Sequence, residues 1–256
     1  MKKPGLGCAV LISFALFSLA RQGRAANPVG EQLLNGNFES FTDGLPNDWV
    51  YDPEGVGPAV LQSSAYTSPF ISVYPAGNYS ILLDNTPTAS PDPVMYQFYT
   101  GFKGGFSMSF DFRLSGALQG NAWDVMPLST SGIVPFDLLV DQGGEFAASD
   151  VLTLENIAAL SPNTWYNVDV TGSISSGKYS GTITPYGGTA VSWSDYSFIT
   201  AVSVFSGISI DNNGGEDAAN TPVYFDNVSI DAVPEPSTAV LAVVGMLLVF
   251  KFRPAR

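Results

Sequence analysis

The fold is decided by the run Phe-Ser-Met-Ser-Phe-Asp-Phe at residues 106–112, in which four apolar residues alternate with three polar ones. Successive side chains of a β-strand point to opposite faces, so this alternation predicts a strand with one buried and one outer face. Residues 165–171 and 223–230 show a similar alternation and are also rich in β-branched and aromatic residues. We therefore expect a series of strands that are each buried on one side.

The rest of the central region extends this pattern. Turn-forming glycine, serine and asparagine clusters separate the apolar runs, as at residues 104–105, 143–144 and 187–188. Further strands are predicted at residues 79–84, 94–100, 136–140, 179–184, 191–193 and 201–210. Residues 150–159 are expected to hold a helical turn and little more.

Strands buried on one side predict an all-β fold, a two-sheet antiparallel β-sandwich. A β-helix or a propeller would need a repeat at fixed spacing, which the sequence lacks.

The N-terminus has the layout of a secretory signal peptide. Lys2 and Lys3 precede an apolar stretch at residues 9–20, which is too short to span a bilayer comfortably. Small residues allow signal peptidase to cut after Ala20 or after Ala25. Cys8 precedes the apolar run and so does not occupy the position of a lipobox cysteine.

The C-terminus combines three features in a fixed order. Val233-Pro234-Glu235-Pro236 comes first, then an apolar segment at residues 239–250, then Lys251, Arg253 and Arg256. The prolines favour an extended backbone that an enzyme can bind in its active site, and the basic residues favour the cytoplasmic side of a membrane. An ordinary membrane anchor accounts for the apolar segment and the bases but leaves Pro-Glu-Pro unexplained.

This order of motif, apolar helix and basic tail resembles the PEP-CTERM sorting signal. The resemblance implies recognition by an exosortase in a Gram-negative bacterium, cleavage near the motif, and release into an extracellular or biofilm matrix. The expected organisation is a signal peptide at residues 1–25, a β-sandwich at 26–232 and a sorting signal at 233–256. The expected route is export through the inner membrane, with the C-terminal transmembrane helix as a transient anchor.

Charge and residue types narrow the function of the central region. Residues 27–233 contain 22 acidic and three basic residues, a net charge of −19, and neither histidine nor cysteine. Such a surface repels nucleic acids and anionic lipids and favours cations and neutral partners. Disulfides, histidine- or cysteine-ligated zinc, and Ser-His or Cys-His catalysis are excluded for this region.

Two ends of the central region carry a second resemblance. Leu-Leu-Asn-Gly-Asn-Phe-Glu at residues 33–39, with Leu-Pro-Asn-Asp-Trp at 45–49, resembles the opening of jelly-roll carbohydrate-binding modules of the galactose-binding-like type. Tyr-Phe-Asp-Asn-Val-Ser-Ile at residues 224–230 resembles their last strand, although concanavalin-like sandwiches also end on this sequence motif.

The second resemblance implies that the first and last strands lie together and that a structural Ca²⁺ is bound between them. Its expected ligands are Glu39, Asp226 and the chain around Gly36 and Asn37. Calcium prefers six to eight oxygen ligands, which carboxylates and carbonyls supply.

Aromatic residues in polar surroundings are the candidates for sugar binding, because flat rings stack on the apolar faces of sugars. We expect Trp123, Trp193 and Tyr196 to contact a glycan. Trp49 and Trp165 alternate with polar residues in predicted strands and are expected in the core.

Other acidic clusters give weaker indications of a cation site or a catalytic site. The loop at residues 211–217 lacks the order of an EF-hand and is expected to be solvated. Asp137, Asp141 and Glu145 offer carboxylates, yet the E-x-D-x-x-E pattern of concanavalin-like glucanases is absent. The sequence therefore predicts a non-enzymatic, exported protein that binds extracellular polysaccharide. The alternatives are a structural matrix component with no ligand site and, less favoured, a glycoside hydrolase.

Overall fold

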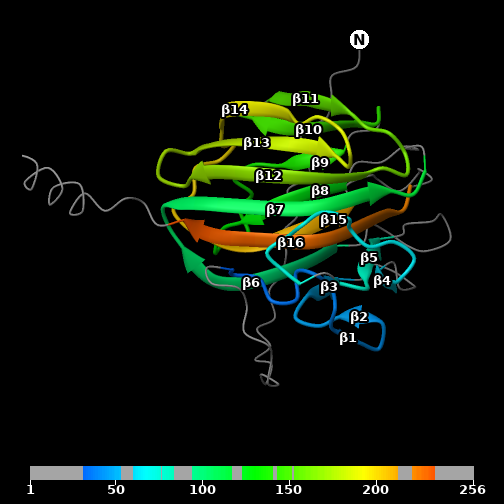
Figure 1. The fold of residues 1–256 in the computed structure, drawn as a ribbon. Coiled ribbons are helices and arrows are strands. Elements are labelled where there is room, and N and C mark those ends of the chain that lie inside the picture. Colours follow the sequence, from blue (N-terminus) through cyan, green and yellow to red (C-terminus); the bar gives the residue numbers. More distant parts are fainter. Residues whose placement is uncertain are drawn as a thin grey trace, which may run out of the picture.

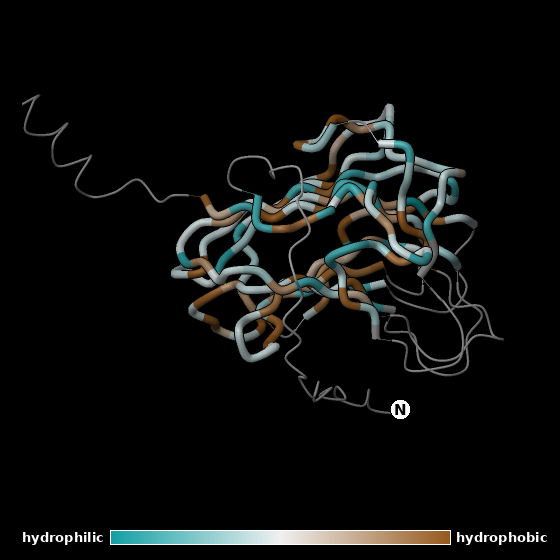
Figure 2. Tube along the Cα trace, turned by 90° about the horizontal axis from the view of Figure 1, so that it is seen from below, coloured by the Kyte–Doolittle hydropathy of each residue, from teal (hydrophilic) through white to brown (hydrophobic). Residues whose placement is uncertain are grey.

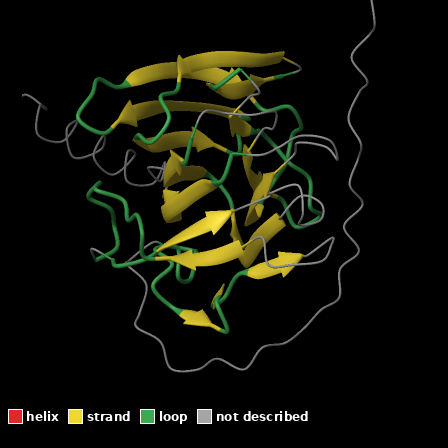
Figure 3. Cartoon of the chain, turned by 90° about the vertical axis from the view of Figure 1, so that its right-hand side faces the viewer, coloured by secondary structure: helices red, strands yellow, loops and turns green. Residues whose placement is uncertain are grey.

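The computed structural model describes residues 31–52, 60–75, 77–83, 94–116, 123–140, 143–151, 153–212 and 221–233. Within these ranges every regular element is a strand, as the cartoon in Figure 3 shows. The strands are β1 (Phe41–Thr42), β2 (Leu45–Pro46), β3 (Val50–Asp52), β4 (Val60–Ser63), β5 (Ser80–Leu83), β6 (Val94–Phe102), β7 (Gly105–Leu114), β8 (Trp123–Leu128), β9 (Leu138–Val140), β10 (Glu145–Asp150), β11 (Thr153–Ala159), β12 (Trp165–Ser173), β13 (Lys178–Pro185), β14 (Val191–Ser197), β15 (Phe205–Asn212) and β16 (Val223–Val233).

Two seven-stranded antiparallel sheets make up the molecule (Figure 1). The front sheet has the order β14-β13-β12-β7-β16-β5-β4, and the back sheet has the order β11-β10-β9-β8-β15-β6-β3. A small β1–β2 hairpin lies outside both sheets. The predicted all-β, two-sheet sandwich is confirmed.

The two terminal signals expected from the sequence lie outside the described residues. These are the signal peptide at residues 1–25 and the sorting signal after Val233, with its apolar segment at 239–250. No helix long and apolar enough to cross a membrane occurs in the described residues.

The core lies between the sheets, where the apolar phase of each strand meets the other sheet (Figure 2). Phe106, Met108, Phe110 and Phe112 of β7 are buried there, as the alternation predicted. Phe136 stacks on Tyr179 of the front sheet, with 4.2 Å between ring centroids. Burying an aromatic side chain of this kind contributes roughly 1.5–3 kcal/mol.

Four strands of the back sheet differ from the sequence-based expectation. The helical turn expected at residues 150–159 is wrong, because residues 153–159 form β11, an edge strand paired with β10. Most of its side chains are exposed, so it lacks the alternation of a half-buried strand. β8 and β10 were not predicted, and β15 begins at Phe205 rather than at residue 201.

The opening and closing segments lie together, as expected. Glu31 forms an isolated antiparallel bridge with Asp231, and the amide of Val228 donates to the carbonyl of Gly36 at 2.8 Å. A Cβ atom on Gly36 would lie 1.9 Å from the carbonyl oxygen of Val228. Glycine is therefore required in the opening motif by close approach of the last strand.

A β-bulge interrupts β16 at Asn227. Asp226 pairs with Asp111 of β7 and Ser229 pairs with Ser109, so β16 carries one extra residue between these pairs. Asn227 has a left-handed backbone with φ of 52°, which suits asparagine. The bulge places Phe225 and Val228 both in the core and leaves the Asp226 and Asn227 side chains to bond groups outside it.

Candidate binding face

The candidate site is the outer face of the front sheet, on the side away from the core. The strand registers align its side chains in rows across β13, β12, β7 and β16. One row holds Thr184, Asn167, Asp111 and Asp226, and the next holds Thr182, Asp169, Ser109 and Ser229. This part of the sheet therefore presents hydroxyl, amide and carboxylate groups side by side.

An extended segment, residues 64–75, lies against part of this face, and we call it the strap (Figure 1, cyan). Its alternate side chains contact the front sheet. The Ser68 amide donates to Asp226 at 2.9 Å, and the Ser68 hydroxyl donates to Asp111 at 2.6 Å. The Ser72 hydroxyl donates to Asn227 at 2.9 Å, and the Tyr74 hydroxyl donates to the carbonyl of Val228 at 3.1 Å. The strap is thus held by polar groups over β7 and β16.

Aromatic side chains border the open part of the face. The guanidinium of Arg113 lies 3.7 Å from the ring centroid of Tyr66 and donates to Asn163 at 2.9 Å. Phe70 of the strap packs edge-on against Tyr186, with 5.6 Å between centroids. Tyr186 remains 60% exposed and Tyr66 43% exposed. These rings provide exposed flat surface next to polar groups.

The strap covers two acids in the same row. Asp111 is 1% exposed and Asp226 4% exposed. Burial raises the pKa of Asp226 to about 7, and the nearby Asp111 and Glu39 carboxylates add to the rise. Burial also raises the pKa of Asp111, against hydrogen bonds from Ser68, Asn227 and Asn167 that favour its charged form.

The predicted aromatic ligand residues are elsewhere. Trp123 is 1% exposed in the core and donates its indole N–H to the carbonyl of Thr221 at 3.2 Å. Trp193 is 5% exposed, packed against Phe146. Neither tryptophan presents a ring face to solvent, so the structure offers no support for a glycan on them. The half-buried Tyr196 packs on Tyr179. Trp49 lies in the core as predicted.

Tyr186 was not among the predicted aromatic residues, which were Trp123, Trp193 and Tyr196. A usable signal was its position just after β13, two residues beyond the polar Thr184 and directly before the Gly187-Gly188 turn. Trp165 is buried but belongs to the outer phase of β12, opposite Arg113, rather than to the core between the sheets.

The expected calcium ligands already accept hydrogen bonds. Oε1 of Glu39 accepts the amides of Asn78 and Tyr79 at 2.8 and 2.7 Å. Both oxygens of Asp226 accept amides, from Ser68 and Asn227. Amide groups aimed at an oxygen carry positive charge toward it and leave less room for a cation, so these residues fit Ca²⁺ poorly. Asn37 is half-buried, and no group of three acidic side chains arranged for a metal occurs in the described residues.

In the part of the chain that the structure describes, the other acids named from the sequence do not form a second metal site. Asp137 lies near Asp124 and Asp211 on the outer side of the back sheet, and burial raises its pKa. Glu145 accepts a hydrogen bond from Asn156 on β11. Asp141 and most of the loop at residues 211–217 lie outside the described residues.

Comparisons with known proteins show the fold but no family. No protein-family model matches the chain, and no curated protein matches its sequence. Among solved structures, the catalytic domain of the glycoside hydrolase family 131 protein from Coprinopsis cinerea is similar, with a TM-score of 0.51 and 12% identity over 73% of this chain and 84% of that one. The seed lectin of Lotus tetragonolobus has a TM-score of 0.47 and 11% identity, over 78% and 98% of the two chains. A sialidase has a TM-score of 0.48 and 13% identity over 61% of this chain, which spans 16% of that protein.

The buried carboxyls predict an unusual dependence of stability on pH. Burial raises the pKa of both Asp226 and Glu31 to about 7, so folding favours their neutral forms. Their stabilising contribution is complete below about pH 4 and is lost as the pH rises through about 7. We expect the free energy of unfolding to fall by about 2–4 kcal/mol per group over this range, measured by urea denaturation. Asp226→Asn should flatten the profile, and greatest stability above pH 7 would contradict the expectation.

Calcium dependence is a second test. Because Glu39 and Asp226 already accept amide hydrogen bonds, we expect EDTA to leave the Tm of the full chain unchanged. Differential scanning fluorimetry with EDTA, and with calcium added back, measures this. A fall in Tm that calcium reverses, and that Glu39→Gln abolishes, would instead support the calcium site implied by the resemblance.

Proposed function

We propose that this chain is an exported, exosortase-processed surface protein whose front sheet binds polysaccharide in the extracellular matrix. The observation that carries the binding proposal is the outer face itself. Rows of hydroxyl and amide groups on β12 and β13 adjoin the exposed ring of Tyr186. Sugar sites combine a flat apolar surface with hydrogen-bonding groups in this way.

Lectin-like β-sandwich folds among the similar structures agree with this proposal but do not carry it. One of them is described as a lectin complexed with galactose, at a TM-score of 0.44. Similarity at this level concerns the fold alone, and binding has to be argued from side chains.

A glycoside hydrolase is the weaker alternative. The carboxyls that face each other across strands, Asp111 and Asp226, form the pair such chemistry would need. Both are covered by the strap and hydrogen-bonded to it, so a substrate has no access to them in this conformation. A structural matrix component without a ligand is the other alternative, and the binding experiment separates it from the proposal.

Removal of the exposed ring tests binding. We expect Tyr186→Ala to weaken retention of the full chain by a soluble neutral polysaccharide about tenfold, because a stacking surface is lost. Affinity electrophoresis in gels containing β-glucan or galactomannan measures the retention. Phe98→Ala is the matched control, since Phe98 is 41% exposed but lies on the back sheet. No retention of the unaltered chain by any polysaccharide would favour the structural alternative.

The sorting part of the proposal rests on Val233-Pro234-Glu235-Pro236 and the apolar and basic residues after it. In a Gram-negative host that carries an exosortase, we expect joint replacement of Pro234 and Pro236 by alanine to block processing. The uncut chain should then accumulate in the inner-membrane fraction, as judged by immunoblotting. Normal release of this variant would contradict an exosortase route.

A further inference from the structure

We infer that the outer face selects polysaccharides with free amino groups, and that Asp169 is the residue that recognises the protonated amine. This inference rests on the proposed function and adds a class of ligand to it. It follows from the place of Asp169 in the sheet, the groups around it and the absence of a balancing charge.

Asp169 occupies the middle of the open face. It lies on β12, is exposed, and is directly opposite Ser109 on β7 and Thr182 on β13. Directly opposed side chains on neighbouring strands are separated by about 5 Å at their Cβ atoms. One carboxylate is therefore flanked on both sides by a hydroxyl group.

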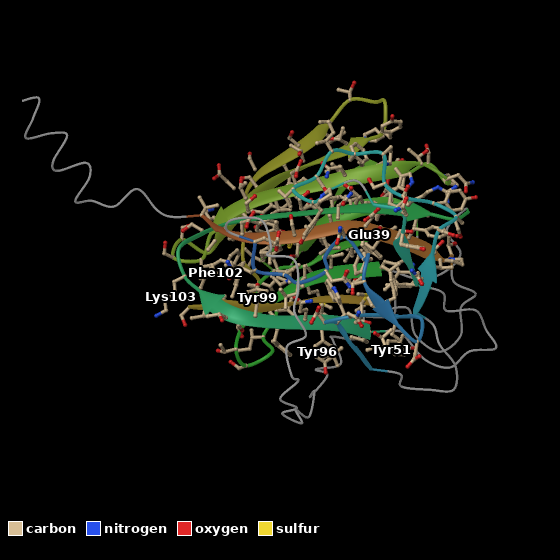
Figure 4. The ribbon with its side chains drawn as sticks, turned by 60° about the horizontal axis from the view of Figure 1, so that its bottom comes forward. Glu39, Tyr51, Tyr96, Tyr99, Phe102 and Lys103 are labelled. Carbon is tan, nitrogen blue, oxygen red and sulfur yellow. The ribbon has the colours of Figure 1, made fainter. Side chains whose placement is uncertain are left out.

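Asp169 has no cationic partner on this face. The central region has three bases, and each is committed or distant. Arg113 is buried against Tyr66 and bonds to Asn163, and Lys178 donates to the carbonyl of Asp195 at 3.0 Å. Lys103 lies at the end of β6 in the back sheet, near Tyr99 and Phe102 (Figure 4). Within the described residues the Asp169 carboxylate accepts no hydrogen bond and forms no ion pair.

The surroundings strengthen the preference for positive charge. Asp111, two residues beyond Ser109 on β7, is close enough to Asp169 for their repulsion to help raise the pKa of Asp111. Charges within about 8 Å interact appreciably at physiological ionic strength. An anionic sugar such as a uronate is repelled here, whereas an ammonium group is attracted.

A sugar ammonium matches the available acceptors. It carries three N–H donors, and Asp169, Ser109 and Thr182 together offer a carboxylate and two hydroxyl oxygens. A divalent metal fits less well, since calcium requires six to eight oxygens and one exposed carboxylate supplies two. The exposed ring of Tyr186 on the same face favours a sugar over a lysine-rich peptide.

The test compares two ligands that share one sugar backbone and differ only at the nitrogen, which is a charged amine in one and a neutral acetamide in the other. Isothermal titration of the full chain with a glucosamine oligomer and with its fully N-acetylated form is carried out at mildly acid pH and low salt. We expect tighter binding of the free amine form, and Asp169→Asn to weaken it about fivefold while leaving the acetylated form unaffected. Glu155→Gln on β11 removes the same charge from the other sheet and should change neither affinity.

Each other outcome overturns the inference. Equal affinity for the two oligomers, or equal losses in Asp169→Asn and Glu155→Gln, removes amine recognition by Asp169 and leaves polysaccharide binding intact. A lysine oligomer that binds as tightly as the glucosamine oligomer, with the same dependence on Asp169, shows a site for cations in general. Failure of these and all neutral sugars to bind removes the proposed function as well.

Discussion

The contact between Gly36 and the bulge in β16 is the constraint on which the site depends. The opening segment approaches the last strand so closely that the carbonyl of Val228 occupies the space of a side chain. That approach coincides with the extra residue at Asn227, whose left-handed backbone leaves the amide of Val228 free to bond Gly36. The same irregularity brings Asp226 and Asn227 to the groups that hold the strap. The bulge in β16 therefore both joins the first and last segments of the chain and positions the strap that limits the open face.

The carboxyl groups of the outer face lie in two different surroundings. Asp111 and Asp226 are buried beneath the strap, receive several hydrogen bonds and favour neutrality. Asp169 lies two positions away in the ladder and stays in water. The strap thus divides the acids of the outer face into a structural part, which it covers, and a part accessible to ligand. A fold with only three bases in its central region has few other means to stabilise so many carboxylates.

Prediction from sequence succeeded where burial produces a local pattern. The alternation at residues 106–112 identified β7 and its buried phenylalanines. The sequence motifs at both ends of the central region predicted that the first and last segments lie side by side. β11 was misassigned because an edge strand exposes both faces and shows no alternation. Trp123 was misplaced because its polar sequence neighbours do not reveal that β8 lies in the interior of a sheet. The strap alternates Tyr66, Ser68, Phe70, Ser72 and Tyr74, yet it is held by side chains instead of strand pairing, which sequence alone does not distinguish.

The bulge also sets how tolerant the chain is to changes in length. Side chains of a strand alternate between faces, so loss of one residue shifts every later position to the opposite side. If Asn227 were an ordinary strand residue, strict alternation from Phe225 would bury Ser229 and Asp231 and expose Ile230. Deletion of Asn227 would therefore keep Val228 and Ile230 in the core phase, whereas deletion of Ser229, after the bulge, would turn Ile230 to the outer face. Insertions in the Gly187-Gly188 turn, by contrast, would lengthen a loop outside the sheets and leave the strand registers unchanged. Variation in chain length is therefore best tolerated next to Tyr186, at the edge of the open face.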